Sequence, residues 1–149
     1  MLRQHAVAFT HHLYEYLDHG GTAHGAATLG IDEHNLIKTL VMEDDEKNPL
    51  IILMHGDRQV STKALARSLG VKTITPCTTQ TANRLTGYQV GGISPLGTRR
   101  SLPVYMESSI LALPDIYVNG GKRGFLVSLR PEDLRCLLHP LLVEVAIPA

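Results

Sequence analysis

Short apolar and β-branched runs, separated by turn residues, dominate the hydrophobic pattern of this chain. The run LIKTLVM at Leu36–Met42 predicts a strand. It is followed by a charged turn at Glu43–Pro49 and then by Leu50–Met54, which is expected to be the hairpin partner. The same pattern predicts further strands at Ala8–Tyr16, Val71–Thr75, Leu102–Met106, Asp115–Asn119 and Val143–Ile147.

Helices are predicted where a capping residue or proline begins an apolar face and a glycine can end it. Ser61–Leu69 is the clearest, with Ser61 as its cap and Gly70 at its end. The other predicted helices are Thr22–Leu29, Thr78–Leu85 and Pro131–Leu138. Many strands among few short helices predict one compact α/β domain over residues 1–149, with a mixed β-sheet and short flanking helices. Most connections are too short for a doubly wound parallel order.

The composition narrows the function. The chain has 149 residues, of which 44% are hydrophobic, so a real core is possible. The formal net charge is +0, so no global field directs the protein to nucleic acid or to an anionic membrane, although local basic patches remain possible. No apolar run approaches the roughly 20 residues of a membrane span, and MLRQHAVAFTHHLYEY has no signal-like apolar segment. A cytoplasmic protein with no membrane partner is expected.

Lys38 is the first candidate for chemistry, because it interrupts an otherwise apolar strand. A lysine in a strand usually points into water, but one directed into a pocket could bind an anionic or carbonyl oxygen. Thr39 beside it adds a hydroxyl, on the opposite face if the strand is regular.

Two glycine-rich loops are the second candidate. In GYQVGGISPLGTRR, at residues 87–100, Gly91 and Gly92 permit positive φ and close approach of a ligand, while Pro95 holds Ser94 extended. Successive backbone N–H groups there could form an oxyanion-binding concavity, although a tight turn without a ligand would have the same composition. GGKRG, at residues 120–124, adds Lys122 and Arg123, which suit phosphate.

Other catalytic groups are poorly supported. His11, His12, His19, His24 and His55 could suggest a metal site, but no HExxH or comparable spacing occurs, so no metal or other cofactor is expected. Ser94 and Ser101 lack a GxSxG motif. Cys77 and Cys136 form no CxxC pair and are expected to be small buried hydrophobes.

Three segments occur in an order that resembles a known family. They are LIKTLV, then TGYQVGGISPLGTRRSLPVYME at residues 86–107, then IYVNGGKRG at residues 116–124. Together they resemble the YbaK/ProX family of free-standing aminoacyl-tRNA deacylases, which are related to the editing domain of bacterial prolyl-tRNA synthetases. The resemblance runs from about Ala8 to the C-terminal strand and is closest to the Cys-tRNA(Pro) deacylase branch. The chain begins late relative to that family, so most of the family's first helix is expected to be missing.

The resemblance implies a single α/β domain whose mixed sheet curls around a pocket for the aminoacylated 3′ end of tRNA. It implies that Lys38 is the key lysine and that the N–H groups of Gly91 and Gly92 hold substrate oxygens. Where the family usually has serine this chain has Asn119, and His24 stands where an aromatic residue is usual. The candidate substrate-binding residues are Tyr14, His24, Thr39, Ser94, Asn119, Gly120, Gly121, Lys122 and Arg123.

The reaction implied is hydrolysis of the ester of mischarged tRNA(Pro), with Cys-tRNA(Pro) as the first candidate and alanine or serine as alternatives. Lys38 would anchor the terminal phosphate or ribose, and Arg99, Arg100, Lys122 and Arg123 would contact phosphates. A transient complex with prolyl-tRNA synthetase is expected, for a monomer or weak homodimer. The rivals are a non-catalytic module that binds a tRNA end or nucleotide and a metal-dependent hydrolase.

Overall fold

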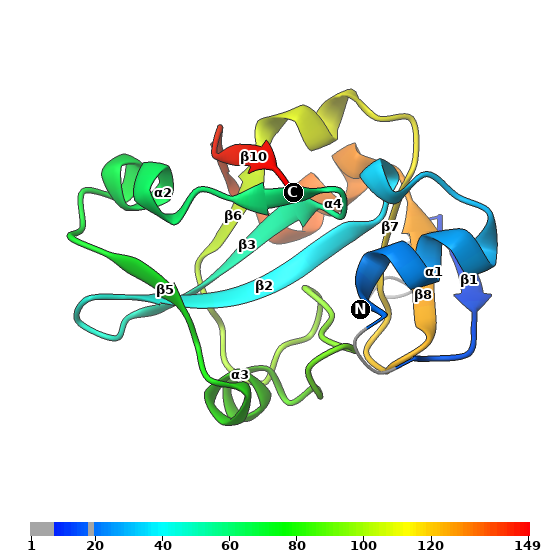
Figure 1. The fold of residues 1–149 in the computed structure, drawn as a ribbon, viewed down its shortest axis with the longest axis horizontal. Helices are drawn as coiled ribbons and strands as arrows, with labels where there is room; N and C mark the ends of the chain where they lie inside the picture. Colours follow the sequence, from blue (N-terminus) through cyan, green and yellow to red (C-terminus); the bar gives the residue numbers. More distant parts are fainter. Residues whose placement is uncertain (1–7, 18–19) are drawn as a thin grey trace.

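A five-stranded mixed sheet forms the centre of the protein (Figure 1), and the computed structural model describes residues 8–17 and 20–149. Across the sheet the order is β5(Ile74–Pro76), β2(Ile37–Asp44), β3(Pro49–His55), β6(Val104–Glu107) and β9(Leu141–Val143). Strand β2 is antiparallel to β3 and β5, whereas β6 is parallel to β3 and to β9. The predicted hairpin and the predicted α/β class with a mixed sheet are both confirmed.

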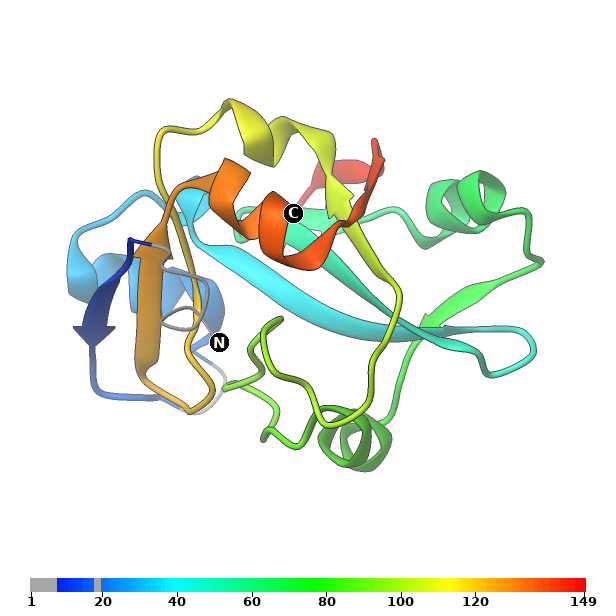
Figure 2. The ribbon, with the colours of Figure 1, turned by 180° about the vertical axis from the view of Figure 1, so that it is seen from behind.

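Two smaller sheets complete the fold. Strands β1(Thr10–Leu13), β8(Phe125–Leu129) and β7(Ile116–Asn119) form an antiparallel sheet in that order, and β4(Arg58–Val60) pairs with β10(Ala146–Pro148). An isolated parallel bridge between Leu36 and Tyr117 joins β7 to the beginning of β2. This bridge brings the three-stranded sheet against the edge of the central one (Figure 2).

Alternation along β2 and β3 divides the core into two clusters. Ile37, Val41 and Leu53 belong to one cluster with residues of α3(Thr79–Thr86) and α4(Pro131–Leu138). Met42 and Met54 belong to the other, with residues of α2(Thr62–Leu69). Successive side chains of a strand point to opposite faces, and each face of the hairpin packs against one of these clusters. Because both faces are covered, the two strands are almost continuously apolar. Helix α1(Gly21–Leu29) packs with β7 and β8 through a third cluster.

The predicted helix ends are confirmed by local geometry. The hydroxyl of Ser61 accepts a hydrogen bond from the Ala64 N–H, and Gly70 ends α2 in the left-handed conformation. Thr78 caps α3 in the same way, and Gly87 ends it. Helix α4 begins with Pro131 as predicted.

Several elements differ from the sequence-based expectation. Strands β4 and β8 and the 3-10 helices η2(Glu33–Asn35) and η3(Ser108–Ala112) were not predicted, β1 is shorter than Ala8–Tyr16, and β5 begins at Ile74 instead of Val71. The predicted single strand Val143–Ile147 is wrong, because β9 and β10 belong to different sheets. The buried carboxylate of Glu107 lies at the break and accepts the N–H groups of Val145 and Ala146 at 2.7 and 3.1 Å. It replaces the strand partners that those groups would otherwise need.

We expect Glu107→Ala to lower the free energy of unfolding by about 1.5–3 kcal/mol, which hydrogen bonds to a charged group typically contribute. The substitution leaves the buried Val145 N–H without its acceptor. Chemical denaturation measures the change. Glu144→Ala removes the same charge from an exposed neighbour and should alter stability by less than about 0.5 kcal/mol; equal effects of both variants would contradict this role for Glu107.

Candidate functional site

The candidate site lies where one edge of β2 is unpaired. Strand β3 occupies one edge from Ile37 to Glu43, so β5 and β7 must lie along the other edge. There β7 reaches only Leu36, and β5 reaches only Met42–Asp44, with the Cys77 N–H bonded to the Val41 C=O. A gap of about four residues is left between them, and a cavity of about 500 Å³ opens there. That volume is in the range of small-molecule sites.

The cavity combines an apolar wall with a few polar groups. The described residues that line it come from residues 14–17 and 21–24, residues 36–40, the start of α3, the glycine loop at residues 90–93, the end of β7 with the loop after it, and β8. The predicted site residues that line it are Tyr14, His24, Lys38, Thr39, Gly91, Asn119 and Arg123. The apolar lining residues are Leu17, Leu36, Ile37, Leu40, Val90, Ile93 and Leu126.

Lys38 is half-buried at the cavity, and its ammonium donates a hydrogen bond to the Arg58 carbonyl. Burial lowers the pKa of Lys38 below its ordinary value, and the carboxylates of Glu33 and Asp57 oppose this shift. The side chain is therefore not simply solvated, and its remaining N–H donors are available to an anionic group.

Thr39 faces the opposite side of β2 from Lys38, as predicted, because it shares the face of Ile37 and Val41. Its Oγ1 atom is buried without a hydrogen-bond partner among the described residues. The backbone of Thr39 also points to the open edge, since Val41, two residues later, directs its C=O there. A buried hydroxyl without a partner is costly, so this position suits a polar group of a ligand.

Gly91 and Gly92 have different roles, which corrects the expectation that both N–H groups hold substrate. Gly92 is buried, does not line the cavity, and donates its N–H to the Gln89 C=O at 2.7 Å. A Cβ on Gly92 would lie 2.6 Å from the backbone nitrogen of Arg123 and 2.7 Å from the carbonyl carbon of Lys122. Gly91 has φ of 94° and lines the cavity, and its N–H has no protein acceptor within the described part of the chain. Gly91 is thus the oxyanion candidate, and Gly92 permits close backbone packing.

Asn119 connects the two glycine loops. Its side-chain Nδ2 donates to the Gly91 C=O at 3.3 Å, and its Oδ1 accepts the Gly121 N–H at 2.7 Å. Arg123 adds a second connection, because its Nε donates to the Val90 C=O at 3.0 Å. Asn119 and Arg123 therefore join the two loops to each other at the cavity.

Two tyrosines and a histidine close the cavity on the N-terminal side. Burial, and then the nearby Tyr16, raise the pKa of Tyr14. The Tyr14 N–H donates to the Gly124 C=O at 2.9 Å, and the His24 ring donates to the Glu15 C=O at 2.8 Å. Tyr16, which also lines the cavity, was missed by sequence reasoning. The guanidinium carbon of Arg123 lies 4.7 Å from the centre of its ring. The spacing of two residues from Tyr14 in HLYEY could have indicated it.

Other predicted substrate-binding residues do not line the cavity. Ser94 is 2% exposed, and its hydroxyl accepts the Leu96 N–H, so it stabilises a turn. Gly120, Gly121 and Lys122 are not among the lining residues, and the Lys122 ammonium lies 5.6 Å from the centre of the Phe125 ring. Arg99 and Arg100 are exposed and also outside the lining.

The histidines and cysteines take separate positions. Within residues 8–17 and 20–149 no group of three or more His, Cys, Asp or Glu side chains could hold a metal ion, and His19 lies outside the described residues. The expectation that both cysteines are buried is wrong for Cys136, which is exposed, while Cys77 is partly buried. Among the described helices, none is long and apolar enough to cross a membrane.

Comparison with known proteins gives a consistent result. A family model described as the aminoacyl-tRNA editing domain matches residues 21–137. A candidate Cys-tRNA(Pro)/Cys-tRNA(Cys) deacylase of Enterococcus faecalis, EbsC, is 29% identical over 146 residues, which cover 97% of this chain and 89% of that protein. A proline–tRNA ligase of Brachyspira hyodysenteriae is 27% identical over 88 residues, or 59% of this chain, but these are only 15% of the ligase.

A solved structure supports the same fold. It is described as a candidate trans-editing enzyme for prolyl-tRNA synthetase, with a TM-score of 0.84 and 20% identity. The superposition covers 98% of this chain and 92% of that one.

We expect Gly92→Ala to lower the free energy of unfolding by about 1–3 kcal/mol, the usual cost of forcing extra atoms into a packed position. The new methyl group must push the 120–124 loop away from Gly92. Urea denaturation provides the measurement. Ser101→Ala, an exposed change in the same segment, is the control, and an unaltered stability of Gly92→Ala would show that the loops are not packed as described.

Proposed function

Because the chain belongs to the aminoacyl-tRNA editing domain family, we propose that it is a trans-editing deacylase that hydrolyses the ester of mischarged tRNA(Pro), with Cys-tRNA(Pro) as its main substrate. The observation that carries the proposal is the cavity at the free edge of β2. It brings together the Lys38 ammonium with the Thr39 hydroxyl and the Gly91 N–H, neither of which has a hydrogen-bond partner among the described residues.

The substrate is an ester between an amino acid and a ribose hydroxyl of the terminal adenosine. The Gly91 N–H donates to the carbonyl oxygen on which negative charge develops, and one well-placed oxyanion donor contributes about 3–4 kcal/mol. Lys38 binds the terminal phosphate or ribose and thereby fixes the ester relative to Gly91. Thr39 offers its hydroxyl to a polar group of the amino acid or ribose.

The attacking group comes from solvent or from the substrate. None of the described lining residues is serine or cysteine, and the proposed mechanism uses no protein nucleophile. In hydrolysis, a water oxygen bonds to the carbonyl carbon, the ester bond to the ribose breaks, and a proton passes to the ribose oxygen. With a cysteinyl ester, the substrate's own thiol can attack instead and leave as a cyclic thiolactone.

The identity of the amino acid depends on residues specific to this chain. Asn119 and His24 both line the cavity, and each donates a hydrogen bond from a side-chain nitrogen to a backbone carbonyl. A cavity excludes larger side chains by volume but discriminates weakly among smaller ones. Alanine and serine esters therefore remain the alternative substrates, and the synthetase or tRNA supplies the remaining selectivity.

The partners follow from this reaction. We propose that the aminoacylated 3′ end of tRNA is the substrate and that prolyl-tRNA synthetase is a transient partner in the cytoplasm. The proposed oligomeric state is a monomer or weak homodimer. Exposed Arg99 and Arg100, with Lys122 and Arg123, would contact phosphates near the acceptor end. Such contacts make tRNA binding sensitive to salt even at zero net charge.

Lys38→Ala should reduce the deacylation rate by about 100-fold, because the ester is no longer fixed relative to Gly91. The measurement is loss of labelled amino acid from Cys-tRNA(Pro), Ala-tRNA(Pro) and Ser-tRNA(Pro), each followed in parallel. Lys63→Ala removes an exposed lysine and is the matched control.

Rapid, Lys38-dependent loss from one substrate identifies the amino acid. Intact binding of tRNA(Pro) with no loss from any of the three esters would contradict the deacylase and support a non-catalytic binding module.

The rate should also depend on pH through Lys38. Its anchoring charge is present below its pKa and disappears as the pH rises through it, and burial places that pKa below the ordinary 10.5. We expect the enzymatic rate, corrected for spontaneous ester hydrolysis, to begin its decrease with rising pH below pH 10.5. Lys38→Arg keeps its charge, so any activity it retains should not show this decrease. A decrease of the same shape in both proteins would assign it to another group.

A further inference from the structure

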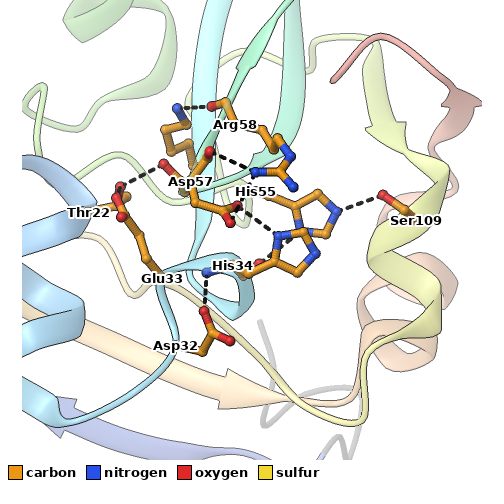
Figure 3. Close-up of polar contacts among 10 residues, drawn as sticks. Thr22, Asp32, Glu33, His34, His55, Asp57, Arg58 and Ser109 are labelled. Atoms are coloured by element: carbon orange, nitrogen blue, oxygen red, sulfur yellow. Dashed lines mark hydrogen bonds and ion pairs between the residues drawn. The ribbon is translucent and has the colours of Figure 1, made fainter. Parts of the chain in front are cut away.

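A polar cluster lies beside the cavity, outside the residues that line it (Figure 3). We call it the histidine cluster, and it consists of His34, His55, Asp57 and Ser109. These residues come from η2, β3, the turn after β3, and η3. The deacylase mechanism uses none of them, although His55 is only 1% exposed and a buried ionisable side chain is costly to place.

The two imidazole rings are held in one arrangement. They stack with their centres 3.8 Å apart and their planes within 5°. His55 Nδ1 donates to the His34 C=O at 2.8 Å, since a carbonyl can only accept, and Nε2 then accepts from the Ser109 hydroxyl at 2.7 Å. Burial lowers the pKa of His55, so its ring stays neutral and keeps this tautomer. His55 thus fixes the position of His34.

His34 in turn holds Asp57. Its Nδ1 donates to Asp57 Oδ1 at 2.7 Å, and Arg58 Nη1 donates to the other carboxylate oxygen at 3.3 Å. Burial alone would raise the pKa of Asp57, but the His34 hydrogen bond and the charges of His34 and Arg58 together keep it below the ordinary value. Asp57 is therefore ionised and tethered at neutral pH.

The residue before Asp57 is packed closely on the segment that precedes β2. The Gly56 N–H donates to the Leu36 C=O at 2.7 Å, and Thr22 Oγ1 lies 3.1 Å from the Gly56 C=O. A Cβ on Gly56 would lie 2.7 Å from the carbonyl oxygens of both Glu33 and Leu36. The next carbonyl after Asp57, that of Arg58, is the acceptor for the Lys38 ammonium.

We propose that the histidine cluster positions Lys38 for the reaction, with His34 and Asp57 as positioning residues that act through the Arg58 carbonyl. The contacts from Ser109 through His55 and His34 end at Asp57, the residue before Arg58. The Arg58 carbonyl is the only protein acceptor of the Lys38 ammonium within the described part of the chain. When the link between His34 and Asp57 is broken, Gly56 still holds the start of the turn, but the Asp57 side chain is no longer tied to η2. The Arg58 peptide after it can then shift, and the Lys38 ammonium follows its acceptor out of its half-buried place. The part of this proposal that concerns turnover rests on the proposed deacylase function.

The first test is single-turnover deacylation of Cys-tRNA(Pro) with the enzyme in excess. His34→Ala should lower the maximal rate constant about 10- to 100-fold, since small misplacements of a catalytic group have effects of that size. The enzyme concentration that gives half the maximal rate should change less than about twofold, because the four other proposed phosphate contacts, Arg99, Arg100, Lys122 and Arg123, remain.

His34→Asn is the rescue variant, because its amide nitrogen can donate to Asp57 in place of Nδ1, and it should recover most of the rate. Asp115→Asn is the control, because Asp115 is exposed and makes no ion pair or side-chain hydrogen bond in the described structure. Equal losses in His34→Ala and His34→Asn, or none in either, would overturn the positioning role.

The second test does not need activity. Competitive acetylation with acetic anhydride over a series of pH values, read by peptide mass spectrometry, titrates Lys38 against exposed Lys63 in the same sample. Since burial is the main cause that lowers the pKa of Lys38, release of the ammonium in His34→Ala should move its labelling curve to higher pH.

In His34→Asn, the labelling curve of Lys38 should return to that of the wild-type protein. A Lys38 curve that is the same in wild type and His34→Ala would overturn the proposal. A wild-type protein that deacylates none of the tRNA esters would instead count against the proposed function, and the labelling result would then decide the positioning role by itself.

Discussion

Strand β2 is fully paired on one edge and open in the middle of the other, and the site depends on this asymmetry. Strand β5 covers only Met42–Asp44, and β7 reaches only Leu36, so residues 38–40 face a cavity instead of a neighbouring strand. Unpaired edge backbone is usually a liability because it can pair with other chains. Here the flanking segments enclose it, and it becomes a set of hydrogen-bonding groups for a ligand. The alternation of β2 then directs Lys38 and Thr39 to opposite sides of the same opening.

The enclosure requires main-chain segments to approach more closely than side chains allow. Gly92 packs on the backbone of residues 122–123, Gly124 packs on Tyr14, and Gly91 packs on the Tyr16 ring. Each contact would bring a Cβ within 3 Å of another heavy atom, so each position needs glycine. Asn119 and Arg123 add hydrogen bonds to the carbonyls of Gly91 and Val90. The two loops are thus joined to each other by hydrogen bonds as well as by close packing, and the proposed mechanism relies on donors held in place in this way.

Much of the fold could be predicted from local patterns. The β2–β3 hairpin follows from two apolar runs around a charged turn, and α2, α3 and α4 follow from Ser61, Thr78 and Pro131 at their starts. Strand β8 was missed because it directly follows the GGKRG loop, and β4 because RQV has no apolar pattern. The division of the last strand depends on Glu107, 38 residues before Val145, which no local pattern contains.

For the site, the sequence alone determined which residue types are present: a lysine in an apolar strand, two glycine loops and their basic residues. Those follow from local composition, which the chain carries wherever it folds. Only the tertiary structure decided which of them meet. It left the Gly91 N–H free and engaged that of Gly92, it buried Ser94 in a turn, and it added Tyr16 to the cavity. It also joined His34, His55 and Asp57 to Lys38 through one carbonyl. Such outcomes depend on contacts between residues distant in sequence, whose geometry is fixed only when the sheets pack together.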